Sequence, residues 1–190
     1  MIRTVFFLIL LVCIGSLGLQ RLNFATANPP ADPVQAPEFT HGGDQEWINS
    51  HPLTIKGLRG KVILIDFWTF DCWNCYRSFP WLRALEARLK TEDFRVIGVH
   101  TPEFDHEKIR RNIVDKVAQF DLHHPVMIDN DYSYWQAMQN HYWPAFYLID
   151  RTGYIRAVYY GETHAGDRQA IAIEKMIQHL LNESIQVTSE

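Results

Sequence analysis

Two cysteines separated by two residues carry the clearest chemical signal in this sequence. Cys72 and Cys75 follow an apolar run rich in β-branched residues, Val62 to Trp68, and they open a segment with helical periodicity. At the start of a helix, unpaired amide groups and the helix dipole stabilise an anion, so a thiolate at Cys72 is favoured. The three-residue offset lets Cys75 face Cys72. The pattern predicts reversible disulfide chemistry at this pair.

A carboxyl group stands six residues before the first cysteine, inside the apolar run. Burial of an unpaired carboxylate is costly and raises its pKa. On a strand that leads to the pair, Asp66 points into the space beneath it and can take a proton from Cys75 as that thiol attacks. The alternative is a structural aspartate that hydrogen-bonds to the backbone or pairs with Lys61.

The overall composition fits one globular domain. The chain has 190 residues, of which 47% are hydrophobic and 21% are charged, and its formal charge is −4. A mildly acidic chain of this kind offers no strong electrostatic attraction to nucleic acid or anionic lipid.

Residues 1–27 have the layout of a secretory signal peptide. Arg3 precedes an uncharged apolar run from Val5 to Leu19, and Ala25-Thr-Ala27 closes the segment. The run is shorter than the roughly 20 residues that span a bilayer, but a tilted anchor through residues 4–20 also fits. Cys13 lies in this segment, so a processed chain would keep only the Cys72–Cys75 pair and no multi-bridge framework.

Residues 28–38 contain four prolines and predict an extended spacer. We therefore expect a folded domain over residues 39–190. Within it, hydrophobic periodicity predicts helices near 75–90, 105–120, 132–140 and 167–182, and strands near 62–68, 94–99, 126–128, 145–149 and 154–160. The order β-α-β-α-β-α-β-β-α predicts an α/β domain with helices on both faces of one sheet. Pro80 should kink the first helix.

Several segments resemble one family. Residues 65–75, Ile-Asp-Phe-Trp-Thr-Phe-Asp-Cys-Trp-Asn-Cys, are similar to the active-site segment of the thioredoxin superfamily, and Pro80 also matches. The extra strand and helix after Val99 resemble the TlpA-like branch. Residues 68–75, 98–104 and 140–145 resemble the exported thioredoxin-like domain of DipZ proteins. The resemblance implies a thioredoxin fold, with a mixed central sheet and a TlpA-type strand–helix insertion.

The resemblance also implies a function and a set of site residues. It predicts a cis-proline at Pro144, facing catalytic Cys72, Cys75 and Asp66. It implies an extracytoplasmic thiol–disulfide oxidoreductase that acts as a reductase on cysteine-containing proteins and receives electrons from a membrane thiol donor. No cofactor beyond the redox-active disulfide is expected. A disulfide-forming oxidant is the alternative direction.

Three tryptophans are predicted to form an apolar rim around Cys72 on which partner proteins dock. They are Trp68, Trp73 and Trp143. Trp73 stands at a helix start, where burial is difficult, so we expect it to be exposed. For Trp68, packing in the core is the alternative.

The sequence departs from the family pattern at two positions. Asp71 precedes Cys72, where a negative charge raises the thiol pKa and favours a more reducing pair; Arg77 is expected to offset this in part. Ser78 stands where many TlpA-like reductases have a glutamate. Glu103 either reaches the site from its loop or is a solvated acid.

Other functions use the same residues differently. A copper or zinc carrier would need the cysteine pair and a histidine, but no histidine stands at ligand spacing from Cys72, so we predict no metal. His123 and His124 are expected on a loop surface. A peroxidase would show a different cysteine motif, and a pure binding module would not need the set of Asp66, Cys72, Cys75 and Pro144.

Overall fold

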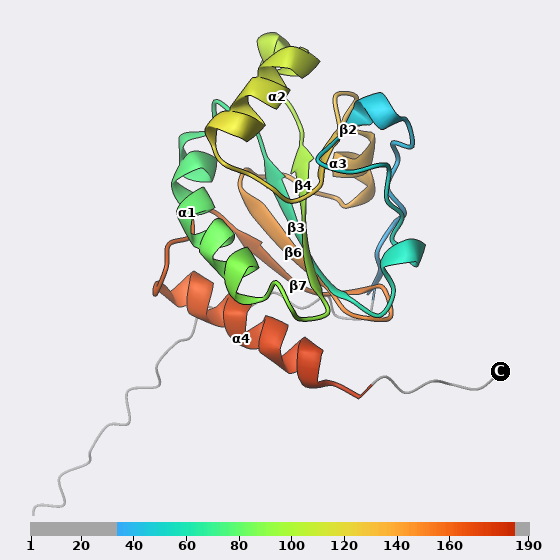
Figure 1. Ribbon diagram of the computed structural model, residues 1–190, viewed down its shortest axis with the longest axis vertical. Coiled ribbons are helices and arrows are strands. Elements are labelled where there is room, and N and C mark those ends of the chain that lie inside the picture. The colour runs from blue at the N-terminus through green and yellow to red at the C-terminus, as the bar shows by residue number, and fades with distance from the viewer. Residues whose placement is uncertain (1–33, 185–190) are drawn as a thin grey trace, which may run out of the picture.

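The computed structural model describes residues 34–184, and their strands form a single mixed sheet (Figure 1). The segment 1–27, with its predicted signal peptide or anchor, lies outside the described residues. The described strands are β1 (Val34–Gln35), β2 (Trp47–Ile48), β3 (Val62–Trp68), β4 (Phe94–His100), β5 (Val126–Ile128), β6 (Ala145–Ile149) and β7 (Tyr154–Tyr160). Their order in the sheet is β1-β7-β6-β3-β4-β5-β2.

The helices lie on both sides of this sheet. They are α1 (Trp73–Arg88), α2 (Arg110–Gln119), α3 (Ser133–Ala137) and α4 (Arg168–Asn182), with short 3-10 helices η1 (Asp44–Glu46), η2 (Lys56–Leu58) and η3 (Asp105–Lys108). Pro80 lies inside α1, as predicted. Between residues 34 and 184, none of the helices is both long and apolar enough to cross a membrane.

Strand β3 is the centre of the fold. It pairs in parallel with β4 and antiparallel with β6, and every residue of β3 is buried. A strand covered on both faces needs apolar side chains at successive positions, which explains the continuous apolar run in the sequence. The strand ends a few residues before the Cys72–Cys75 pair at the start of α1.

The alternation of side chains along β3 divides the interior into two cores. Leu64 and Trp68 pack with residues of α1, α2 and α4, whereas Ile65 and Phe67 pack with η2 and α3 on the other face. Because side chains two residues apart share a face of a strand, Asp66 points to the side that α1 covers. The central acid and the cysteine helix therefore belong to one layer.

The N-terminal boundary differs from the prediction. Val34 and Gln35 pair antiparallel with β7, and Ala36 is buried. The Glu38 carboxylate accepts hydrogen bonds from the amides of Ile55 and Lys56 at 2.8 and 3.0 Å. The predicted spacer over 28–38 is therefore wrong for residues 34–38, because a two-residue edge strand between prolines has no detectable periodicity.

The predicted helix over 105–120 is also two elements. Ile109 is extended, with φ −77° and ψ 109°, and it separates η3 from α2. Its side chain is exposed. The break matters because it turns η3 back toward the segment that precedes Cys72.

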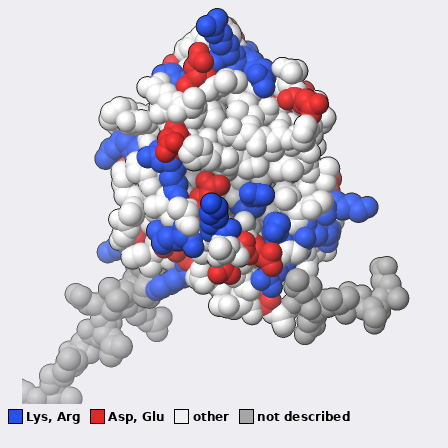
Figure 2. All heavy atoms as spheres, in the orientation of Figure 1, with Lys and Arg blue, Asp and Glu red and all other residues white. Residues whose placement is uncertain are grey.

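Charges are mixed over the surface. On the face shown in Figure 2, basic and acidic side chains lie side by side, and a white area of uncharged residues lies below the charged side chains at the top of the view. This agrees with the small net charge of the sequence.

Candidate functional site

The cysteine pair is a disulfide at the N-terminus of α1. Cys72 is the N-cap residue, its sulfur accepts a hydrogen bond from the Cys75 amide at 3.2 Å, and the two sulfurs are bonded to each other. Cys72 is partly exposed, whereas Cys75 is fully buried. This geometry lets a partner reach Cys72 first and leaves Cys75 to resolve a mixed disulfide from inside.

Asp66 is buried, with 1% of its surface exposed. Among the described residues, no group forms a hydrogen bond to its Oδ1. Burial raises the pKa of Asp66 to about 8, so the folded protein keeps this acid protonated at neutral pH. The predicted alternative of pairing with Lys61 is wrong, since the Lys61 ammonium lies 3.3 Å from Asp93.

Pro144 lies at the same end of the sheet as the cysteines. Its neighbour Ala145 pairs with Phe67 near the end of β3, and the chain reaches Cys72 a few residues after that strand. The Trp143–Pro144 peptide bond is cis, which confirms the expected geometry. The carbonyl oxygen of Pro144 accepts a hydrogen bond from the Gly161 amide at 2.9 Å.

Ser78 has a structural place in the site. Its buried hydroxyl donates to the Asn74 carbonyl at 2.8 Å and accepts from the Thr163 amide at 3.0 Å. Since Gly161, in the same loop, binds Pro144, this hydroxyl links the cysteine helix to the cis-proline segment. A side chain that cannot hold a charge therefore replaces the glutamate of many TlpA-like proteins.

The predicted tryptophan rim is wrong for Trp68. This side chain has no exposed surface, and its ring packs edge-on against Phe79 at 5.5 Å and His100 at 4.9 Å. It shares the core face of β3 with Leu64, as the period-two alternation requires. Trp73 is 67% exposed, as expected, and the half-buried Trp143 packs against Trp135 with ring centroids 4.3 Å apart and an interplanar angle of 35°.

A shallow apolar depression of about 260 Å³ opens beside the first cysteine. A second one of about 400 Å³ continues along α1 and shares two of its aromatic side chains. Most residues that line the depression beside Cys72 are not recognisable from the sequence, because they come from a loop, from α1 and from the end of α2. The lining residues are Phe70, Asp71, Cys72, Trp73, Tyr76 and Phe120.

Asp71 has a different partner from the one predicted. Its carboxylate lies 2.6 Å from Nε2 of His106, on η3, whereas Arg77 pairs with Glu162 at 3.1 Å. The expectation that Arg77 offsets the Asp71 charge is therefore wrong. Because both members of the Asp71–His106 pair are about half exposed, solvent screens their charges.

Glu107, also on η3, is a site residue that no pattern in the sequence indicates. Its side chain is fully buried and accepts hydrogen bonds from the Thr69 hydroxyl and the amides of Asp71, Glu103 and Phe104. Burial alone raises the pKa of Glu107, but these four donors bring it below the ordinary value. Glu103 itself is exposed and contributes only its amide.

Two histidines are buried in the same layer. His100 lies against Thr69, with 3.4 Å from Nε2 to the hydroxyl oxygen, and burial lowers its pKa to about 4. His124 was expected on the surface, but it is buried, with Nδ1 at 3.3 Å from the Glu86 carboxylate. The prediction for His124 failed because the next strand begins inside the sheet.

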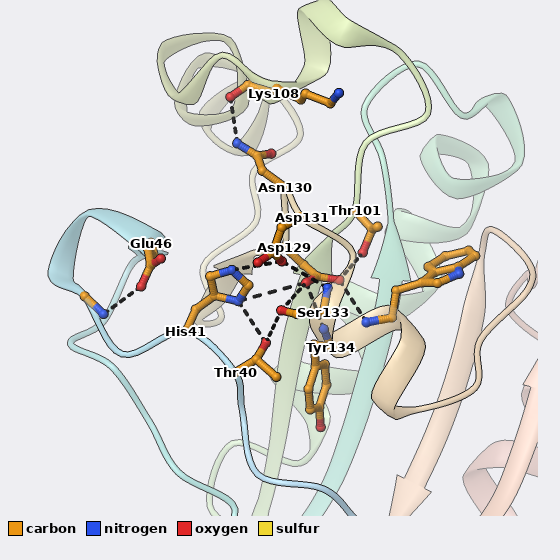
Figure 3. A network of polar contacts seen from close by, with 12 residues as sticks. Thr40, His41, Glu46, Thr101, Lys108, Asp129, Asn130, Asp131, Ser133 and Tyr134 are labelled. Carbon is orange, nitrogen blue, oxygen red and sulfur yellow. Dashed lines mark hydrogen bonds and ion pairs between the residues drawn. The ribbon is translucent and has the colours of Figure 1, made fainter.

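A histidine and two aspartates come together away from the cysteine motif in sequence. Among the described residues, His41, Asp129 and Asp131 form the only group whose potential ligand atoms all lie within 4.8 Å of one another (Figure 3). The Asp129 oxygens, however, already accept from the Thr101 hydroxyl and from two amides at the start of α3. This network holds the N-terminal segment against α3, and neither cysteine belongs to it.

A model of the Redoxin family matches residues 33–173. The chain belongs to the Redoxin family. The match spans all the described strands, from β1 to β7, and includes Asp66, Cys72, Cys75 and Pro144.

Relatives of this Redoxin-family chain include thiol–disulfide oxidoreductases. DipZ of Mycobacterium tuberculosis is 40% identical over 141 residues, which cover 73% of this chain but 20% of DipZ. Thiol-disulfide oxidoreductase YkuV of Bacillus subtilis is 30% identical over 149 residues, or 78% of this chain and 95% of YkuV. The chain thus spans about a fifth of DipZ and nearly the whole of YkuV.

Solved structures agree on the fold. The thioredoxin-like superfamily protein SPOA0173 superimposes with a TM-score of 0.69 at 26% identity, over 80% of this chain and 98% of that one. The thioredoxin fold of this Redoxin-family chain and its relation to DipZ are thereby confirmed.

Proposed function

We propose that this protein reduces disulfide bonds in other proteins outside the cytoplasm. The observation that carries the proposal is the disulfide between Cys72 and Cys75 at the N-terminus of α1, on the face of β3 that holds the buried Asp66. The family supplies the chemistry class, and the remaining support comes from the residues around the pair and from the N-terminal sequence.

In the forward direction, both cysteines start reduced. The Cys72 thiolate attacks one sulfur of a substrate disulfide, the substrate S–S bond breaks, and the leaving sulfur takes up a proton. Asp66, in the ionised fraction that a pKa of about 8 leaves near neutral pH, then accepts the proton of Cys75, and the Cys75 sulfur attacks Cys72. The second substrate sulfur leaves as a thiolate and takes up a proton. Two electrons have moved to the substrate, and the Cys72–Cys75 disulfide has formed.

The neighbours of Cys72 support the reducing direction. The Asp71 carboxylate stands next to Cys72. Its negative charge, although paired with His106 and screened by solvent, disfavours the thiolate and so favours the oxidised form of the pair. A dithiol donor must then return two electrons to the disulfide. We propose a membrane thiol carrier for this step, by extension from the exported position.

Substrate docking uses the apolar depression beside Cys72. Trp73 and Tyr76 lie with ring centroids 5.7 Å apart, and both are exposed. Exposed aromatic side chains next to a reactive atom are typical of protein interfaces. We propose that they contact the apolar residues that flank a substrate cysteine.

The direction is tested by a redox titration of the purified protein against glutathione or dithiothreitol. We expect a potential closer to about −270 mV, as in thioredoxin, than to about −120 mV, as in DsbA. A potential near that of DsbA would contradict the reductase assignment but not the exchange chemistry.

The roles of the two cysteines are tested by trapping. The Cys75→Ser variant should accumulate mixed disulfides with partner proteins through Cys72, whereas Cys72→Ser should accumulate none and lose turnover. If Cys75→Ser traps no partner in cells, the assigned order of attack is wrong.

The extracytoplasmic location rests on residues 1–27, with their Arg3, apolar run and Ala-Thr-Ala end. A fusion of alkaline phosphatase to the C-terminus of the full chain should be active in bacteria, since this reporter folds only after export. A fusion protein that is made but inactive would contradict the location.

A further inference from the structure

Glu107 is a buried acid close to the reactive cysteine, and the exchange mechanism above does not use it. Its Oε1 accepts from the Thr69 hydroxyl and from the Asp71 amide at 3.0 Å, and Asp71 is bonded directly to Cys72. Its Oε2 accepts from the amides of Glu103 and Phe104 at 2.6 and 2.8 Å. The carboxylate is thus one peptide unit from the residue that carries the reactive sulfur.

The partners of Glu107 hold its charge without neutralising it. All four are N–H or O–H donors, which stabilise the ionised form through dipoles and carry no net charge. They keep the pKa of Glu107 below its ordinary value, so the group stays ionised across the neutral range. The neighbouring Asp71 carboxylate differs, because it is half exposed and lies 2.6 Å from His106.

We propose that the Glu107 carboxylate is a fixed negative charge that destabilises the Cys72 thiolate and makes the Cys72–Cys75 pair more reducing. Its burial limits screening by solvent, so its effect on the Cys72 thiolate is stronger than that of an exposed acid at the same distance. The inference rests on the proposed exchange function and names Glu107 as a positioning residue that acts through the charge on Cys72.

Other titratable and charged groups also face this loop, and the test must hold them constant. They come from β3, the loop before α1, β4, η3 and α2. They are Asp66, Asp71, His100, His106 and Lys116, the last with Nζ at 5.9 Å from the centre of the Phe70 ring.

The test replaces Glu107 by glutamine, which keeps the shape and removes the charge. We expect Glu107→Gln to lower the pKa of Cys72 by about one unit, measured from the pH dependence of iodoacetamide alkylation of the reduced protein. The equilibrium constant with glutathione should shift about threefold to tenfold in the oxidising direction, where tenfold corresponds to about 30 mV.

The sign of the change separates this role from a structural one. If Glu107 only held the loop, its loss would move Cys72 away from the helix N-terminus and raise the thiol pKa. An unchanged or raised Cys72 pKa in Glu107→Gln therefore overturns the proposal. Thr69→Val keeps the charge and removes one hydrogen bond, so it should not lower the Cys72 pKa; an equal fall in both variants would also overturn it.

Glu103→Gln is the matched control, because Glu103 lies in the same loop with an exposed side chain and keeps its amide contact. It should leave the Cys72 pKa unchanged. If Glu107→Gln does not fold, the same change is made in the Asp66→Asn background and compared with Asp66→Asn alone. Removal of the buried Asp66 acid is expected to stabilise the fold of this background. Alkylation and equilibrium with glutathione need no protein substrate, so these results are independent of the reductase assignment.

Discussion

Two buried carboxyl groups flank the cysteine pair and behave in opposite ways. Asp66, on β3, has no hydrogen-bond partner for its Oδ1 among the described residues, and burial raises its pKa to about 8. Glu107, on η3, accepts four hydrogen bonds, and its pKa lies below the ordinary value. Two side chains with almost no exposed surface can therefore differ in ionisation, because hydrogen-bond donors stabilise the charged form of Glu107 and Asp66 lacks them at Oδ1.

The difference in pKa gives the two acids different roles. An acid whose pKa lies at about 8 is partly ionised near neutral pH, and this ionised fraction can accept the proton of an attacking thiol, as proposed for Asp66. An acid whose pKa lies below its ordinary value does not retain a proton at neutral pH, but its charge and its hydrogen bonds fix the loop before Cys72. Pairs of groups whose environments push their pKa values apart are a general mark of acid–base sites.

The largest expected difference between Asp66 and Glu107 is in the pH dependence of stability. Below pH 3.8, Asp66 is protonated in both states; between 3.8 and about 8, the unfolded chain releases the proton and the folded protein retains it. Stability contributed by this group is therefore lost as pH rises to about 8. The full linkage is on the order of 6 kcal/mol, and with relaxation on ionisation we expect about 3 kcal/mol.

Asp66→Asn should remove this loss, so the variant should be more stable than the wild type at pH 7. Urea unfolding of both oxidised proteins from pH 4 to 9 measures the difference. Parallel stability curves would mean that Asp66 ionises normally in the folded state.

The second prediction concerns the rate at which Cys75 resolves a mixed disulfide. Asp66→Asn should slow this step about a hundredfold at pH 7, because the thiol loses its proton acceptor. The release of thionitrobenzoate from a Cys72 mixed disulfide gives the rate. In the wild type the rate should rise with pH toward about 8, and an equal profile in the Asn variant would remove Asp66 from the mechanism.

The third prediction concerns the contribution of Glu107 to stability. Glu107→Ala should destabilise the fold by about 2 kcal/mol at pH 7, because three amides and a hydroxyl lose their acceptor. Since the pKa of Glu107 is lowered by folding, its contribution is present above the unfolded value of 4.5 and is lost as pH falls. This slope is opposite to that of Asp66. Glu103→Ala should change stability by less than about 0.5 kcal/mol, and a larger loss there would place the support elsewhere in the loop.

The smallest expected effect is at Ser78, an uncharged group in the same layer. Ser78→Ala leaves the Thr163 amide without its acceptor and should cost about 1 kcal/mol in chemical unfolding. Asn74→Ala is the control, since Ser78 contacts only the backbone carbonyl of Asn74. If Asn74→Ala lowers the free energy of unfolding as much as Ser78→Ala does, the loss comes from any change at the start of α1 and not from the Ser78 hydroxyl.

Local patterns in the sequence predicted the central features of the site. The apolar run of β3, the cysteine spacing and the proline inside α1 are each visible within a few residues, and the structure has all three. The burial of Trp68 also follows from alternation with Leu64, although its ring had been expected on the surface.

What the sequence could not predict depends on contacts between distant segments. Glu107 is one of several acids in a polar loop, and only the fold of η3 against the Thr69–Asp71 segment selects it for burial. Its one local signal is its third position in η3, from which it accepts the Phe104 amide. Likewise, the strand at Val34–Gln35 exists because β7 offers an edge, and no periodicity marks it.

The central claim is that Cys72 and Cys75 exchange electrons with protein disulfides. The most direct test is the reduction of insulin by dithiothreitol, followed as turbidity, with the purified full chain added in catalytic amount. We expect the wild type to accelerate precipitation and Cys72→Ser to give the uncatalysed rate. A well-folded wild-type protein that leaves the rate unchanged would contradict the account.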